Sequence, residues 1–220
     1  MTLRLNVTTR SGKVRVRAGD LDFVVEGGVV TQREDGIEIR RDRGAKVIDI
    51  QCPRGTDLTV GTLSGNIRLE GPLGTVRVAS ASGKVTVEDT EKLDVRSKSG
   101  NVDIGRCAGE CRVVVTSAKV QIGEAGWALV AGVSGDIEAD AVGRADVKTV
   151  SGKVELGTTG ASDVRVKTVS GTVEIRVPPN AQPSTRLKSI SGKIKNDCLA
   201  GGDGEISVAS VSGTIRVCCE

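Results

Sequence analysis

The chain repeats one short phrase, Ser-Gly followed by one residue and then Val or Ile, nine times. A tenth copy begins at Ser117, where Ala118 stands in place of the glycine. From Ser64 onward the serines recur every 17 to 21 residues. The ten serines are Ser11, Ser64, Ser82, Ser99, Ser117, Ser134, Ser151, Ser170, Ser191 and Ser212. Such a period indicates a chain built from stacked equivalent units.

Each repeat carries apolar residues at fixed distances from its serine. The third residue after the serine is Val or Ile in all ten copies, and the fourth residue before it is aliphatic in all ten. Polar residues alternate with these, which predicts two short strands per repeat. Ser-Gly joins the strands at a corner, where Gly tolerates a positive φ and Ser can bond the local backbone. The length variation falls in a second, Gly-rich junction, which predicts an outward loop.

A single repeat of this size cannot bury its own apolar side. Stacking repeats about 4.8 Å apart would bury the columns as continuous ladders of Val, Ile and Leu, which must supply the core because the chain has one Trp, one Phe and no Tyr. We therefore predict an all-β, single-stranded β-solenoid, right-handed, of about nine coils of 17–21 residues and roughly 40 Å in length. An antiparallel sandwich would also alternate, but it would not require one residue type at one phase in ten copies.

We expect one domain over residues 1–220, with an N-terminal coil and irregular β cap over 1–57 and regular repeats over 58–220. The cap would hide the open edge of the first coil. At the other end, SGTIRVCCE stops directly after a strand, with no charged or Pro-rich cap. That end predicts a free edge able to pair with another copy, and hence a possible homo-oligomer.

The opening residues MTLRLNVTTRSGKV contain no apolar signal region, and the longest apolar runs are far shorter than a membrane span. These features predict a cytoplasmic protein with reduced thiols. Cys107 and Cys111 lack a second pair at zinc-finger spacing and the chain has no His, so we expect neither a metal site nor any other cofactor. Cys111 falls in a core column, and Cys198 and Cys218 fall at neighbouring phases of adjacent coils, where they could reach disulfide distance if oxidised. The net charge of +3 does not favour a dedicated nucleic-acid binder.

The chain resembles the bacterial putative-adhesin β-strand-repeat family, a domain of unknown function. It shares the recurrent SG-x-V/I-x-V/I units and the lead-in CPRGTDLTVGTLSGNIRL, with a similar phrase at VPPNAQPSTRLKSISGKI. The resemblance implies an all-β repeat fold and, in many members, an envelope setting behind a signal or membrane anchor. A second resemblance is to bactofilins, cytoskeletal β-helices of similar coil length, which implies polymerisation.

Two rows of charged residues lie between the core columns and should point outward. Four residues after the serine, Glu138, Glu155 and Glu174 would stack about 5 Å apart as an acidic stripe, a spacing compatible with glycosidase carboxylates or a divalent cation. The other strand predicts a basic patch that could hold phosphate, an anionic polymer or lipid head groups. The basic patch consists of Lys148, Arg165, Lys167, Arg186 and Lys188. The simpler interpretation of both rows is a solvated, charged surface, and pairing between copies is a further alternative.

Three functions remain open at this point. The first is a non-enzymatic scaffold or interaction protein that could self-assemble and be linked to the cell envelope. The second is a binding module that takes an anionic polymer or lipid through the basic patch. The third is a glycan-active enzyme that uses the acidic stripe, which the absence of His and the scarcity of aromatic residues disfavour.

Overall fold

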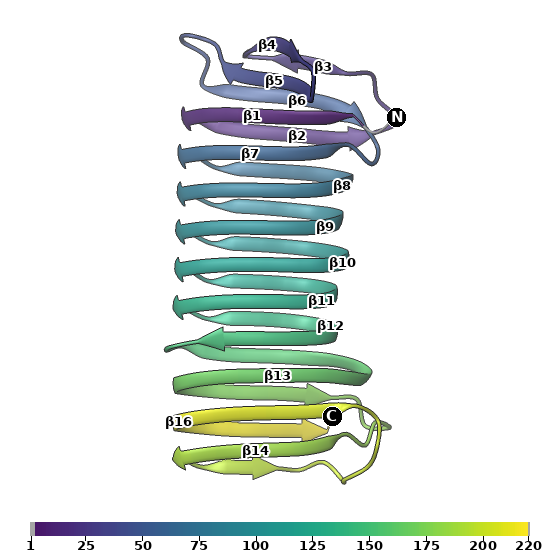
Figure 1. Ribbon diagram of the computed structural model, residues 1–220, viewed down its shortest axis with the longest axis vertical. Helices are drawn as coiled ribbons and strands as arrows, with labels where there is room; N and C mark the ends of the chain where they lie inside the picture. The colour runs from purple at the N-terminus through teal and green to yellow at the C-terminus, as the bar shows by residue number, and fades with distance from the viewer. Residues whose placement is uncertain (1–2, 220) are drawn as a thin grey trace.

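A computed structural model, which describes residues 3–219, shows a rod wound from one continuous sheet of strands (Figure 1). No helix occurs in this described range. The strands are β1 Arg4–Ser11, β2 Lys13–Gly19, β3 Val24–Glu26, β4 Gly28–Arg33, β5 Gly36–Arg41, β6 Val47–Pro53, β7 Asp57–Ser64, β8 Ile67–Ser82, β9 Val85–Ser99, β10 Val102–Ser117, β11 Val120–Ser134, β12 Ile137–Thr149, β13 Lys153–Val177, β14 Ser184–Ser191, β15 Ile194–Asn196 and β16 Glu205–Cys219. The predicted all-β solenoid is confirmed.

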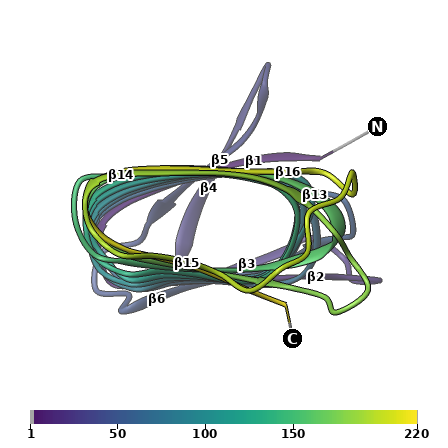
Figure 2. The same ribbon diagram turned by 90° about the horizontal axis from the view of Figure 1, so that it is seen from below.

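Seen along the rod axis, each coil is a flattened ring with two long walls (Figure 2). We call the strand residues before each repeat serine the leading wall, and those after the Ser-Gly corner the trailing wall. Coils stack in parallel and in register, so that Val78 lies beside Val60 on one side and Val95 on the other. The column residues of both walls point inward and fill one continuous core. Residues at the same position relative to the repeat serine therefore pair with one another across neighbouring strands of the sheet.

The repeated serine is a structural element of the corner. The hydroxyls of Ser99 and Ser151 lie 3.3 Å and 3.5 Å from backbone carbonyls of the preceding coil, at Ala81 and Val133. In six of the repeats a Ser or Thr two residues before the serine closes the turn from the other side; Ser97, for example, donates to the carbonyl of Ser99 at 3.1 Å. Hydroxyls used in this way satisfy backbone groups that the corner removes from the ladder. The serines therefore hold coils together rather than face a ligand.

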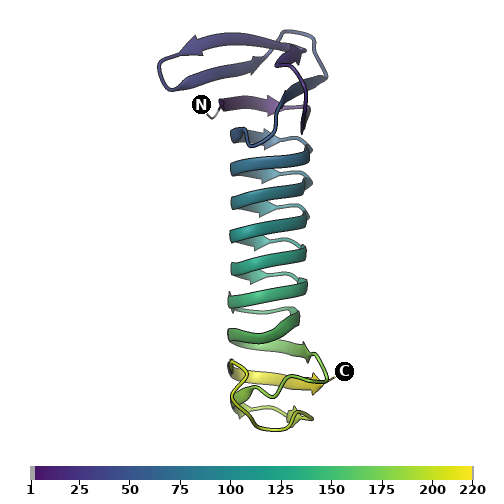
Figure 3. The ribbon, with the colours of Figure 1, turned by 90° about the vertical axis from the view of Figure 1, so that its right-hand side faces the viewer.

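The N-terminal end is covered by strands that do not follow the repeat. β4 and β5 form an antiparallel hairpin, and β5 pairs in parallel with β1. β6 pairs in parallel with β2, and β3 pairs antiparallel with β6. The hairpin projects from the end of the stack (Figure 3). Both walls of the first coil thus have a neighbour on their outer side, which protects their backbone groups from foreign strands.

The C-terminal end departs from the sequence prediction. β16 does not form a free edge, because it lies between β13 and β14 and pairs in parallel with both. The chain first builds an outer coil with β14 and β15, and then returns to fill the position that it skipped (Figure 1). The expectation that SGTIRVCCE leaves an open edge is therefore wrong, and β14 and β15 form the end coil instead.

The end coil carries polar residues where the other coils carry core. Thr185 and Asn196 occupy the positions six before and five after the serine, and Asn196 Nδ2 donates to Thr185 Oγ1 at 3.1 Å. This hydrogen bond joins the two walls of the end coil, beyond which no further coil of the described chain covers the core. A polar pair satisfied by its own hydrogen bond costs little beside water. These two residues mark the spatial end of the stack.

A disulfide joins Cys198 to Cys219. The prediction that Cys198 would approach Cys218 is wrong by one residue, because Asn196 pairs with Val217 and that register sets Cys198 opposite Cys219. The expectation of reduced thiols is also wrong for this pair. The bond ties the loop after β15 to the end of β16. Cys111 is buried in the core as expected, and a hydrogen bond with Cys107 together with burial raises the pKa of its thiol.

Candidate binding surface

The basic patch lies on the leading wall of the last coils, but its order differs from the prediction. Lys148 and Lys167 occupy neighbouring rungs as expected. Lys188 does not follow them, because the inserted β16 places Ala209 between Lys167 and Lys188. In the same way, Ser207 lies between Arg165 and Arg186.

The insertion of β16 separates the cations of the basic patch by one strand that carries small residues at the corresponding positions. Cations on either side of β16 are two rungs apart, about 9.6 Å, rather than about 4.8 Å. The wider spacing reduces their mutual repulsion. Ala209 is exposed and Ser207 half-buried between them. The arrangement can therefore accept an anionic group between two pairs of cations.

Acidic residues neutralise only part of this patch. Lys148 Nζ lies 3.8 Å from Asp146 Oδ1, and Arg186 lies 3.7 Å from Glu205. Arg165, Lys167 and Lys188 form no ion pair with any residue that the structure describes. Their side chains are exposed, so the patch keeps positive charge available to a partner.

The acidic stripe on the trailing wall is, by contrast, occupied by the protein's own lysines. Lys119 Nζ lies 2.9 Å from Glu138, and Lys153 pairs with Glu155. Gln121 also donates to Glu138 at 2.9 Å. These bonds, led by that from Lys119, lower the pKa of Glu138. A glycosidase needs one carboxyl that stays protonated, and the lowered pKa of Glu138 is the opposite of that requirement.

Glu174, the third member of the stripe, faces Arg216 across the β13–β16 pairing. This cation and the two lysines leave the stripe balanced in charge along its length. Within residues 3–219, no group of three or more His, Cys, Asp or Glu side chains could hold a metal ion. No helix in that range is long and apolar enough to cross a membrane.

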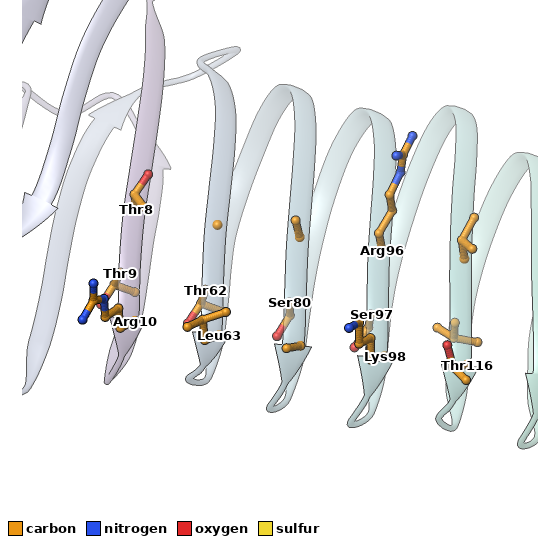
Figure 4. A pocket seen from close by; sticks show the side chains of 15 residues that line it. Thr8, Thr9, Arg10, Thr62, Leu63, Ser80, Arg96, Ser97, Lys98 and Thr116 are labelled. Carbon is orange, nitrogen blue, oxygen red and sulfur yellow. The ribbon is translucent and has the colours of Figure 1, made fainter.

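Two features of the leading wall were missed by sequence reasoning. Nearer the N-terminus the wall has a shallow hollow where Gly61, Ala79 and Ala81 replace longer side chains. Figure 4 shows Arg10 and Lys98 on strands that flank those bearing Leu63 and Ser80. Farther along, the guanidinium of Arg144 lies 4.9 Å from the ring centre of Trp127. Outward glycines and alanines in successive copies were the signal for the hollow.

Comparison with known proteins agrees with this architecture. The family model described as Toastrack DUF4097 matches residues 2–218. The chain belongs to the Toastrack family. This confirms the resemblance to the putative-adhesin repeat domains. A search of curated proteins gave no match to this Toastrack chain.

Two solved structures are similar to this Toastrack chain at low sequence identity. One is a putative adhesin from Bacteroides fragilis, with 13% identity, a TM-score of 0.48, and coverage of 99% of this chain and 92% of that one. The other is a putative cell adhesion protein from Clostridium sporogenes, with 11% identity, a TM-score of 0.24, and coverage of 98% and 92%.

Proposed function

We propose that this Toastrack chain is a non-enzymatic interaction module that binds an anionic partner through the basic patch. The observation that carries the proposal is the set of exposed cations, Arg165, Lys167 and Lys188, without an ion pair among the described residues. Cations left unpaired on a rigid sheet face need no reorganisation to receive an anion. The gap over Ser207 and Ala209 gives that anion a place between them.

An enzymatic role has weaker support. In the acidic stripe, Lys119 pairs with Glu138 and lowers its pKa, Lys153 pairs with Glu155, and the chain contains no His to act as a general base. Four of the repeated serines, Ser82, Ser99, Ser134 and Ser151, donate hydrogen bonds to backbone carbonyls at the corners. These groups account for the residue types that would otherwise suggest hydrolysis.

Neutralising the patch should remove the binding. We expect Lys148, Lys167 and Lys188, all changed to Gln, to lower the affinity for inorganic polyphosphate at least tenfold, since each cation near an anionic surface contributes about 1 kcal/mol. Fluorescence anisotropy with labelled polyphosphate at two salt concentrations measures this, and wild-type binding should weaken as salt rises. The matched control changes Lys84, Lys119 and Lys153 on the trailing wall, where each is ion-paired. Equal loss in both triple variants would overturn the proposal.

The end coil does not favour assembly through that end. Its strands carry Arg186, Lys188 and Lys195, and the corner between them carries Lys193. Two such ends in contact would oppose like charges, and charged residues on edge strands are a recognised defence against pairing. We therefore expect a monomer in size-exclusion chromatography with light scattering at low salt. A stable dimer that dissociates when Ile190 is changed to Lys would contradict this and restore self-assembly as the function.

The disulfide bears on where the module works. Disulfides persist in oxidising compartments and are rare in the cytosol. The Cys198–Cys219 bond therefore supports an extracytoplasmic or envelope setting over the cytoplasmic one expected from the sequence. An anionic envelope component is the partner class consistent with both the bond and the basic patch.

A further inference from the structure

One long margin of the leading wall contains no acidic residue. It consists of the outward residues one and three positions before each repeat serine, twenty in all. The chain's 28 acidic residues among 220 would place about two or three there by composition alone. Acidic residues appear on the same wall farther from the serine, five or seven positions before it. They are Asp57, Asp94, Glu110, Asp146, Asp163 and Glu205.

The margin combines cations with aliphatic side chains. Its cations are Arg10, Arg96, Lys98, Lys148, Lys167 and Lys188, and its larger aliphatic residues are Leu63, Val114, Val133, Val150, Val169, Val211 and Ile190. The remaining positions hold Gly, Ala or Thr. Arg96 and Lys148 have ion pairs, with Asp94 at 3.5 Å and Asp146 at 3.8 Å. In residues 3–219 the other four cations have none. On the trailing wall, by contrast, Lys84, Lys119, Lys153 and Lys195 are ion-paired within the protein.

The aliphatic residues form a row at the C-terminal half. Val133, Val150, Val169, Val211 and Ile190 occupy five successive rungs, because β16 again lies between β13 and β14. Their exposed fractions are 50%, 47%, 48%, 45% and 84%. β-Branched residues left this exposed on a continuous row mark an interaction surface more often than chance exposure.

The chemistry and shape of the margin select among possible occupants. A second copy laid margin to margin would oppose lysine to lysine. A soluble polyanion would satisfy the cations and leave the aliphatic row in water. A flat anionic bilayer satisfies both, with head groups on the cations and the row at the edge of the acyl region. It also contacts all ten rungs, about 43 Å of straight surface.

We propose that this margin docks on an anionic lipid bilayer, with the rod lying along the membrane plane. The inference rests on the proposed function, since the basic patch supplies three of the six cations, and it names the partner. Head-group phosphates would bind between Lys167 and Lys188 over Ala209. Nearer the N-terminal end of the rod, the hollow between Arg10 and Lys98 (Figure 4) would contact the same bilayer.

Vesicle co-sedimentation tests the proposal. The probes are vesicles of phosphatidylcholine alone and of phosphatidylcholine with three-tenths phosphatidylglycerol. We expect binding to the anionic vesicles only, and a loss of about tenfold when Val133, Val150 and Val169 are changed to Thr, which keeps the β-branched shape. The control changes Val24, Val29 and Val30 to Thr on the N-terminal strands, where the side chains are 43%, 53% and 46% exposed. It should bind like the wild type.

The outcomes separate this proposal from the one on which it rests. The margin variant should lose vesicle binding and keep polyphosphate binding, because its cations are intact. Polyphosphate binding without vesicle binding by the wild type would overturn the membrane proposal and leave the anion-binding function. Undiminished vesicle binding by the margin variant would also overturn it. Binding to neither probe would overturn both.

Discussion

Changing Val154 to Asp is expected to unfold the rod. Val154 is fully buried and pairs in register with Ile137 of the coil before it. A carboxylate at this position has no counterion in the aliphatic ladder, and burying such a charge costs more than about 4 kcal/mol. That is a large part of the usual stability of a domain. Far-UV circular dichroism during heating should show a variant that melts far below the wild type or never folds.

The matched control changes Val150 to Asp in the same coil. Val150 points outward and is 47% exposed, so the same substitution places the charge in water. We expect its free energy of unfolding to stay within about 0.5 kcal/mol of the wild type. If Val154→Asp melted like Val150→Asp, the inward assignment of the column three residues after the serine would be wrong.

The second large effect is expected at the corner glycine. Gly152 has φ +122°, and a Cβ there would lie 2.2 Å from the carbonyl oxygen of Gly135 in the preceding coil. The neighbouring backbone cannot move without opening the ladder. Gly152→Ala should therefore lower the free energy of unfolding by more than about 3 kcal/mol, from strain and steric overlap together.

Gly160 supplies a control that separates these two causes. It has φ +109°, but a Cβ added there would meet no other part of the chain within 4 Å, because the residue lies in the outward junction. Gly160→Ala should cost only the conformational strain, about 1–2 kcal/mol. Chemical denaturation of both variants gives the comparison. Similar losses at the two positions would mean that close coil stacking does not require the corner glycine.

The fold could be predicted because one physical demand acts in every copy. Each coil must present Val or Ile at the same height to the coils on both sides, so Val60, Val78 and Val95 recur at one phase. A periodic structure lets ten weak local signals support one another. The corner serine and glycine recur for the same reason, since each contacts the corner of the neighbouring coil.

The C-terminal order could not be read from the same columns. A repeat specifies what its neighbours must look like but not which repeat lies beside it, so any two coils of the right phase can pair. β16 fits between β13 and β14 as well as it would fit after them. The polar Thr185 and Asn196 in core columns were the available signal that this coil ends the stack. The order of the basic patch and the pairing of Cys198 were mistaken for the same reason.

The candidate binding surface was predictable in part. Outward positions are not constrained by core packing, so the positive charge at Lys148 and Lys167 could be predicted from the sequence. Whether acidic residues neutralise that charge depends on contacts with other coils. The sequence predicts the acidic stripe of Glu138, Glu155 and Glu174, and the structure adds the ion pairs of Lys119 with Glu138 and of Lys153 with Glu155. The acid-free margin becomes apparent only when outward residues are aligned along the rod.

The orientation of the rod on a bilayer tests the central claim most directly. An environment-sensitive fluorophore would be attached to a cysteine at Val150, in the margin, or at Gln121, on the exposed trailing wall. The native cysteines outside the disulfide are buried and compete little for the label. On anionic vesicles we expect a blue shift and protection from an aqueous quencher at position 150 and neither effect at position 121. Equal protection at both positions, or protection at 121 alone, would contradict the account.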